Sequence, residues 1–165
     1  MSREAEVVTA LPVEETAISR NVVVMAMAGG LAGTVVMLPV MVLVPQLLGV
    51  FQTEPLANFV GFAAVFGIEP TLTLGAVLFG VGGMVALPLV FLTFGAFLPP
   101  VEPRHLRGVT FGTIFWIGFA IAFWPGGDLA TTVSFVVFSL LGHWLYGFTL
   151  GLTLDRTTGI PQHEV

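Results

Sequence analysis

The stretch Leu140–Leu154, L-L-G-H-W-L-Y-G-F-T-L-G-L-T-L, decides the fold of this 165-residue chain. It is apolar apart from His143 and its hydroxyl groups, and two of its glycines stand four positions apart. Residues three and four apart share one face of a helix. One stripe therefore holds Ser139, His143, Tyr146, Gly147, Leu150 and Gly151. A G-x-x-x-G pair lets a partner backbone come close in lipid, so we predict a packed transmembrane helix over about 130–154.

His143 is the histidine that lies inside an apolar stretch. Ionisable groups in a membrane are costly and are functional candidates by default, so a metal or haem ligand or a proton relay is one interpretation. The other is a neutral ring that faces the bundle, with Ser139 and Tyr146 as the nearest partners on its helix. A metal or haem site normally needs more than one protein ligand, and the sequence offers no second one beside His143. We therefore expect a structural His143 and no cofactor or metal, with haem at His143 as the alternative.

The composition places the chain in a membrane. It is 56% hydrophobic and 9% charged, more apolar surface than a soluble domain of this size can bury. The absence of cysteine excludes disulfides and thiolate metal sites. There is no basic patch to meet phosphates, so nucleic acid is not an expected partner. All five basic residues are arginine and the net charge is -5, which suits the high-salt cytoplasm of a halophilic organism.

Four apolar runs predict four spans, at about 22–44, 72–98, 106–124 and 130–154. They make one membrane domain, 1–165, with polar tails at 1–20 and 155–165. The first run continues past Pro39 and Pro45, so we expect a kink or tilt at these prolines. The predicted fold is an all-α membrane protein, a four-transmembrane-helix bundle with no expected catalytic activity of its own.

The segment between the first two spans, Gln52–Pro70, has an apolar centre at residues 56–67 that is too short to cross a bilayer. It can lie along the interface as a helix, enter the membrane and return on the same side, or form a loop packed over the outer end of the bundle. The residues alone leave these three arrangements open.

Every predicted span carries small residues spaced by four, as close helix contacts in lipid require. The expected packing positions are Gly29, Gly33, Ala76, Gly80, Gly108, Gly112, Gly147 and Gly151. The segment Leu74–Gly80 also matches Leu141–Gly147, which raises the alternative of two repeated hairpins. Ala76 then takes the position of His143, so a repeat would supply no second ligand.

Three segments carry a family resemblance: A-G-G-L-A-G-T-V-V-M-L at 28–38, L-R-G-V-T-F-G-T-I-F-W at 106–116 and G-H-W-L-Y-G-F-T-L-G at 142–151. Over most of residues 25–154 the chain resembles a family of small, uncharacterised four-span membrane proteins of archaea and bacteria. That family has no assigned reaction to transfer. Its members are similar to accessory subunits that accompany archaeal haem–copper terminal oxidases. The resemblance implies an accessory subunit of a larger respiratory complex.

Three functions compete. A non-catalytic accessory subunit needs helix faces that pack against other membrane subunits or against a second copy, and this is the function we expect. A small transporter or exporter acting as an oligomer would need a membrane-embedded carboxylate, yet every Asp and Glu lies in a tail, turn or loop. A membrane cytochrome would need a second axial ligand beside His143.

The arginines predict the topology. With four spans, Arg3, Arg20, Arg104, Arg107 and Arg156 all fall on one side of the membrane, and arginine enrichment marks the cytoplasm. We therefore expect a multi-pass protein of the cell membrane with both termini cytoplasmic. In intact cells, Gln52→Cys and Asp128→Cys should react with an impermeant maleimide. Labelling of Thr158→Cys in their place would overturn this orientation.

Overall fold

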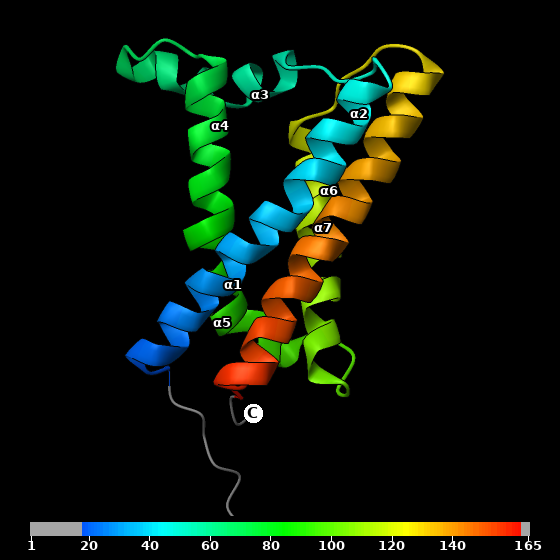
Figure 1. The fold of residues 1–165 in the computed structure, drawn as a ribbon. Coiled ribbons are helices and arrows are strands. Elements are labelled where there is room, and N and C mark those ends of the chain that lie inside the picture. The colour runs from blue at the N-terminus through cyan, green and yellow to red at the C-terminus, as the bar shows by residue number, and fades with distance from the viewer. Residues whose placement is uncertain (1–17, 163–165) are drawn as a thin grey trace, which may run out of the picture.

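The computed structural model describes residues 18–162, and it contains four helices long and apolar enough to cross a membrane. These spans are Arg20–Leu47, Leu72–Phe97, Arg104–Ala122 and Leu129–Thr157. The described part is helical and holds no strand, so the prediction of a four-helix membrane bundle is confirmed. Both ends of the described chain lie at one end of the bundle, the terminal end (Figure 1). The opposite end is called the loop end.

The first span contains α1 (Arg20–Leu38), a π-helical turn (Pro39–Leu43) and α2 (Val44–Leu47). Ser19 caps α1, because its side chain accepts a hydrogen bond from the backbone N–H of Val22. The second span contains α4 (Leu72–Val81), a π-helical turn (Gly82–Ala86), α5 (Leu87–Phe94) and a short 3₁₀ turn (Gly95–Phe97).

The two π turns have the same physical cause. Each is followed at the second position by a proline, Pro45 in the first span and Pro88 in the second. A proline inside a helix lacks the N–H and clashes with the carbonyl four residues before it. A wider turn relieves that clash. In the first span the Val44 N–H donates to the Pro39 carbonyl, five residues earlier, and in the second span the Leu87 N–H donates to the Gly82 carbonyl, also five residues earlier. The irregularity expected at the prolines of the first span is therefore a π turn.

The third span begins with a 3₁₀ turn (Arg104–Leu106) and continues as α6 (Arg107–Ala122), and the fourth is α7 (Leu129–Thr157). Asp128 caps α7, and its carboxylate accepts from the Thr131 N–H at 2.8 Å. That bond holds the pKa of Asp128 below its ordinary value. Helix α7 packs against α1 on one side and α6 on the other.

The connection between the first two spans lies along one end of the bundle. It contains α3 (Glu54–Phe59) and a 3₁₀ helix (Gly61–Phe66), which run across the loop end and do not descend between the spans (Figure 1). Helix α3 packs on α4 so closely that a Cβ at Gly75 would collide with the Leu56 carbonyl. Of the three arrangements that the sequence leaves open, the re-entrant one is therefore not the one in the structure.

Glycines set the closest contacts of the bundle. A Cβ on Gly108 would collide with the carbonyl of Gly147, and the reverse is also true. In the same way, Gly112 lies against the His143 carbonyl and Gly151 against the His105 carbonyl. Helices α6 and α7 therefore touch backbone to backbone, which no larger residue at these positions permits.

On the other side of α7, Gly29 and Gly33 bring α1 close to the same helix. A Cβ on Gly33 would lie 2.9 Å from the Tyr146 ring, and one on Gly29 would lie 3.1 Å from Leu150. The second span differs from the expectation. Ala76 and Gly80 line a cavity, and a Cβ on Gly80 would meet only the end of Met84, at 3.6 Å.

The two hairpins pack differently, because α4 leaves the bundle. The π turn of the second span and α5 cross α1, but α4 diverges from α1 toward the loop end (Figure 1). Its Phe79 ring reaches α6, 5.9 Å from Phe119 and from Phe123. Helices α6 and α7, by contrast, stay packed along their length. The matching segments Leu74–Gly80 and Leu141–Gly147 therefore do not make equivalent contacts.

Residues 155–162 belong to the bundle, whereas the sequence predicts a polar tail at 155–165. Helix α7 continues to Thr157, and Ile160 and Pro161 are buried against the bundle. These apolar residues return to the core because Gly159 turns the chain with a φ of 76°. The predicted N-terminal tail lies mostly outside the described residues.

We predict opposite effects for the same substitution at two glycines. Gly147→Ala should lower the melting temperature in detergent by about 5 °C or more, because its Cβ collides with the Gly108 backbone. Gly118→Ala on α6 is the matched control: its Cβ meets nothing within 4 Å, and alanine favours helix. Its melting temperature should stay the same or rise slightly. Equal losses for both variants would mean that the α6–α7 contact does not depend on Gly147.

Candidate functional site

Tyr146 completes the backbone hydrogen bonding of another span. Its hydroxyl donates to the carbonyl of Gly83, at 2.6 Å, inside the π turn. In that turn the Leu87 N–H bonds Gly82, so the next donor in register would be Pro88, which has no N–H. Proline therefore deprives Gly83 of its helical partner, and the tyrosine supplies the donor from α7. Tyr146 is 2% exposed, so water does not take this role.

His143 points toward α6. Its Nδ1 lies 2.8 Å from the backbone carbonyl of Ser139, one turn earlier. A carbonyl only accepts, so Nδ1 carries the hydrogen, and Nε2 of the neutral ring is left as an acceptor. The ring packs on Phe119, with centroids 4.8 Å apart. No hydrogen bond to Nε2 occurs within residues 18–162.

Ser139 joins the histidine to the third span. Its hydroxyl accepts from the indole Nε1 of Trp116 at 2.9 Å and donates to the Val136 carbonyl at 3.4 Å. The predicted partners Ser139 and Tyr146 therefore share the buried face of α7 with His143, but only Ser139 bonds it. Trp116 was not among the expected site residues. Its side chain reaches Ser139 from a separate span, and residue spacing within one helix does not predict contacts between two spans.

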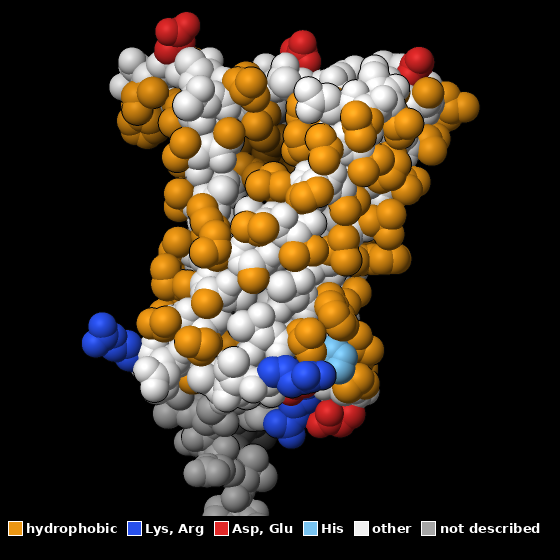
Figure 2. Space-filling view, viewed as in Figure 1, with side chains coloured by type: hydrophobic (Ala, Val, Ile, Leu, Met, Phe, Trp, Pro, Cys, Tyr) orange, Lys and Arg blue, Asp and Glu red, His pale blue; other side chains and the backbone are white. Residues whose placement is uncertain are grey.

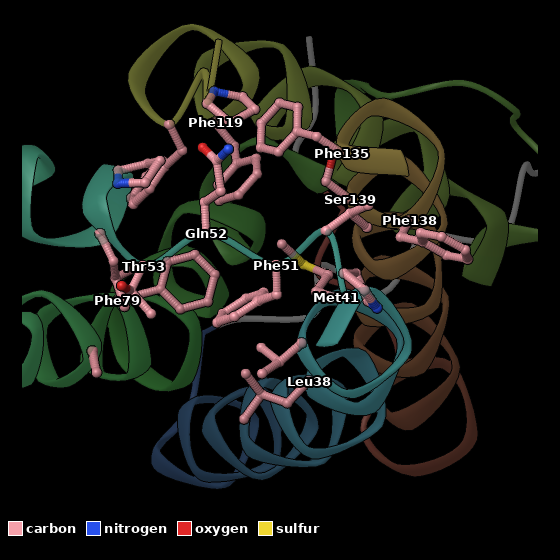
Figure 3. Close-up of a pocket in the computed structure, with 18 of the residues that line it drawn as sticks. Leu38, Met41, Phe51, Gln52, Thr53, Phe79, Phe119, Phe135, Phe138 and Ser139 are labelled. Atoms are coloured by element: carbon pink, nitrogen blue, oxygen red, sulfur yellow. The ribbon is translucent and has the colours of Figure 1, made fainter. Parts of the chain in front are cut away.

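A cavity of about 430 Å³ lies next to Ser139, in the half of the bundle toward the loop end. It occupies the space that α4 leaves on diverging from α1, α6 and α7, and residues 50–53, 55 and 56 line its loop end (Figure 3). Figure 2 shows the surface hollowed between α4 and α2. Its aromatic lining is Phe51, Phe79, Phe119, Phe123, Phe135 and Phe138.

The polar atoms of the cavity are at its two ends. Thr34 and Ser139 stand toward the middle of the bundle, and both hydroxyls are engaged: the Thr34 hydroxyl donates to the Gly30 carbonyl at 2.8 Å. Gln52 and Thr53 stand at the loop end and are exposed. The cavity is therefore apolar along its length and polar at its loop end, which is called its mouth.

Arg107 was expected only as one of the arginines that mark the cytoplasmic side, and the structure places it in the interior. It is 4% exposed. Its guanidinium donates to the carbonyls of Ala96, Pro100 and Val101 and to the side chain of Gln162, at 3.0 to 3.1 Å. The guanidinium is thereby hydrogen-bonded both to the loop before α6 and to the C-terminal segment, and it links these two segments.

A second polar contact closes the terminal end. His105 lies 3.3 Å from the Asp155 carboxylate on α7 and edge-on to the ring of Phe148. Within residues 18–162, no three His, Cys, Asp or Glu side chains come together in a group that could hold a metal ion.

The four spans, the glycine contacts and the lateral cavity define a class: a small multi-pass membrane protein built around helix packing. The chain belongs to a family of unknown function, DUF6789, which matches residues 20–165. That match includes all four spans and the segment across the loop end. No curated protein and no solved structure matches the chain.

Removal of one hydroxyl tests the link between α7 and the second span. Tyr146→Phe keeps the buried ring but leaves the Gly83 carbonyl without a donor, which should lower the free energy of unfolding by about 1–3 kcal/mol. Thr153→Val is the matched control: that hydroxyl bonds the Thr149 carbonyl of its own helix at 2.7 Å. Thermal unfolding in detergent measures both. An equal effect of the two substitutions would contradict a special role for Tyr146.

Proposed function

We propose that the protein is a non-catalytic accessory subunit of a larger membrane complex. The observation that carries this proposal is that the buried polar side chains form hydrogen bonds within the protein. Every fully buried side-chain nitrogen or oxygen atom within residues 18–162 has a hydrogen-bond partner. Tyr146, Arg107 and Ser139 each bond backbone or side chains of another segment. Such polar groups hold helices together, which supports a role in packing against other subunits.

The complex we propose is a respiratory terminal oxidase. The support is indirect: residues 28–38, 106–116 and 142–151 resemble a family of small four-span membrane proteins, and proteins of this kind are similar to accessory subunits of haem–copper oxidases. These three segments contain Gly30, Gly108 and Gly147, whose Cβ positions are filled by other helices of this chain. A subunit of this kind reaches its partners with a preformed bundle and not by folding on them.

A transporter is a weaker candidate because a coupling carboxylate would have to lie within the membrane. The acidic side chains of the described residues all stand near helix ends or in loops: Glu54, Glu69, Glu102, Asp128 and Asp155. The second candidate is a membrane cytochrome, which one observation favours: Nε2 of His143 is not fully buried and has no hydrogen-bond partner within the described residues.

Purification in a mild detergent tests the proposal. The tagged protein should bring down other membrane subunits, and the complex should show the visible spectrum of an oxidase. After the complex is dissociated, the isolated chain should carry no haem absorption. A stable assembly of this chain alone, without other subunits, would contradict the accessory function.

The variant His143→Gln separates the two candidates. Glutamine preserves a polar group at the α6–α7 contact, so the variant should co-purify with the same subunits and show the same spectrum. Leu145→Gln is a matched control on the exposed side of α7, and it reports the cost of an amide in the membrane. Loss of a haem spectrum from a folded His143→Gln variant, with Leu145→Gln unaffected, would replace the accessory subunit by the cytochrome.

A further inference from the structure

The size and position of the cavity limit what can fill it. About 430 Å³ lies within the range of small-molecule sites. The lining is mostly aromatic and aliphatic, and apolar cavities do not hold water. The hollow between α4 and α2 opens sideways, where the spans meet hydrocarbon (Figure 2). A long apolar chain from the bilayer can therefore enter without crossing a polar layer.

The two ends of the cavity are not equivalent. Thr34 and Ser139, toward the middle of the membrane, use their hydroxyls inside the protein. At the mouth the Gln52 amide lies against the α6–α7 loop: a Cβ added to Gly127 would lie 3.5 Å from Nε2 of Gln52. It makes no hydrogen bond within the described residues. Figure 3 shows Gln52 and Thr53 among the lining side chains. An amide both donates and accepts, so the mouth suits a polar head group.

The charges around the mouth select the kind of head group. Glu54, Glu69 and Asp128 lie at the loop end, and the described arginines lie at the opposite end, as the red and blue side chains of Figure 2 show. The lining contains no cation, so a phosphate or carboxylate head group would lie at an end of the molecule that carries only negative charges among the described residues. An uncharged head group avoids this repulsion and can still bond Gln52.

From this geometry we propose that the cavity binds an uncharged lipophile with one long apolar chain and a hydrogen-bonding head group. The chain lies among the phenylalanines between α4 and α6, with its end toward Thr34 and Ser139. The head group bonds Gln52 and Thr53 at the membrane surface. This binding site does not depend on membership of a respiratory complex.

Two probes with the same chain test the charge argument. Native mass spectrometry of the purified protein in a short-chain detergent compares 1-oleoylglycerol with oleate. The neutral glyceride should form a one-to-one adduct with an affinity at least about tenfold higher than that of the anion. Equal binding of both probes would overturn the proposed head-group selection.

Two neighbouring positions on α4 test the location. Ala76 lines the cavity, so Ala76→Phe should fill it and weaken 1-oleoylglycerol binding at least about tenfold. Val77 is 54% exposed, and Val77→Phe adds the same ring on the lipid side without effect on binding. Equal binding by the two variants would place the adduct on the outer surface and overturn the proposal.

Two further variants keep the test decisive. Gly80→Phe blocks the cavity from one turn further along α4, where its Cβ has space, and it replaces Ala76→Phe if that variant does not fold. Gln52→Leu should weaken 1-oleoylglycerol about fivefold through the lost hydrogen bond. Undiminished binding to Gln52→Leu would contradict the proposed place of the head group.

Discussion

The hydrogen bond from Tyr146 to the Gly83 carbonyl is the contact on which the arrangement of the spans depends. In the π turn the Leu87 N–H bonds the Gly82 carbonyl, and the next donor in that register would be Pro88, which has no N–H. A free carbonyl in a lipid-facing bundle costs free energy that water cannot restore. The tyrosine removes this cost by reaching the carbonyl from α7, past α1, which approaches the π turn at Gly30 and Tyr146 at Gly33. The π turn, α1 and α7 thus meet at one point.

The same crossing explains the cavity. Helices that touch at small residues in the middle of the membrane and cross at an angle must separate on both sides of the contact. Toward the terminal end, Arg107 and the returning segment at Ile160 fill the space. Toward the loop end, the side chains of α4, α6 and α7 leave a cavity of about 430 Å³ between them. The structure is therefore closed at one end and hollow at the other.

Much of α7 could be predicted from spacing alone. Ser139, His143, Tyr146 and Gly147 are all buried on one face, and Trp144 is 39% exposed on the other. Helical periodicity is local, so sequence reports it directly. The partners of these residues are not local. His143 bonds the backbone of Ser139 and not its hydroxyl, and Tyr146 bonds a carbonyl 63 residues away.

The sequence by itself determined the membrane environment, the four spans and the glycine face of α7, because composition and period are properties of single segments. Only the tertiary structure decided that Ala76 and Gly80 face a cavity, that Arg107 is buried, and that the chain after α7 returns to the core. The same small residues can pack against a helix or border a space. Which of these occurs depends on where the other spans cross, and that is set by the π turn at Gly83 and its contact with Tyr146.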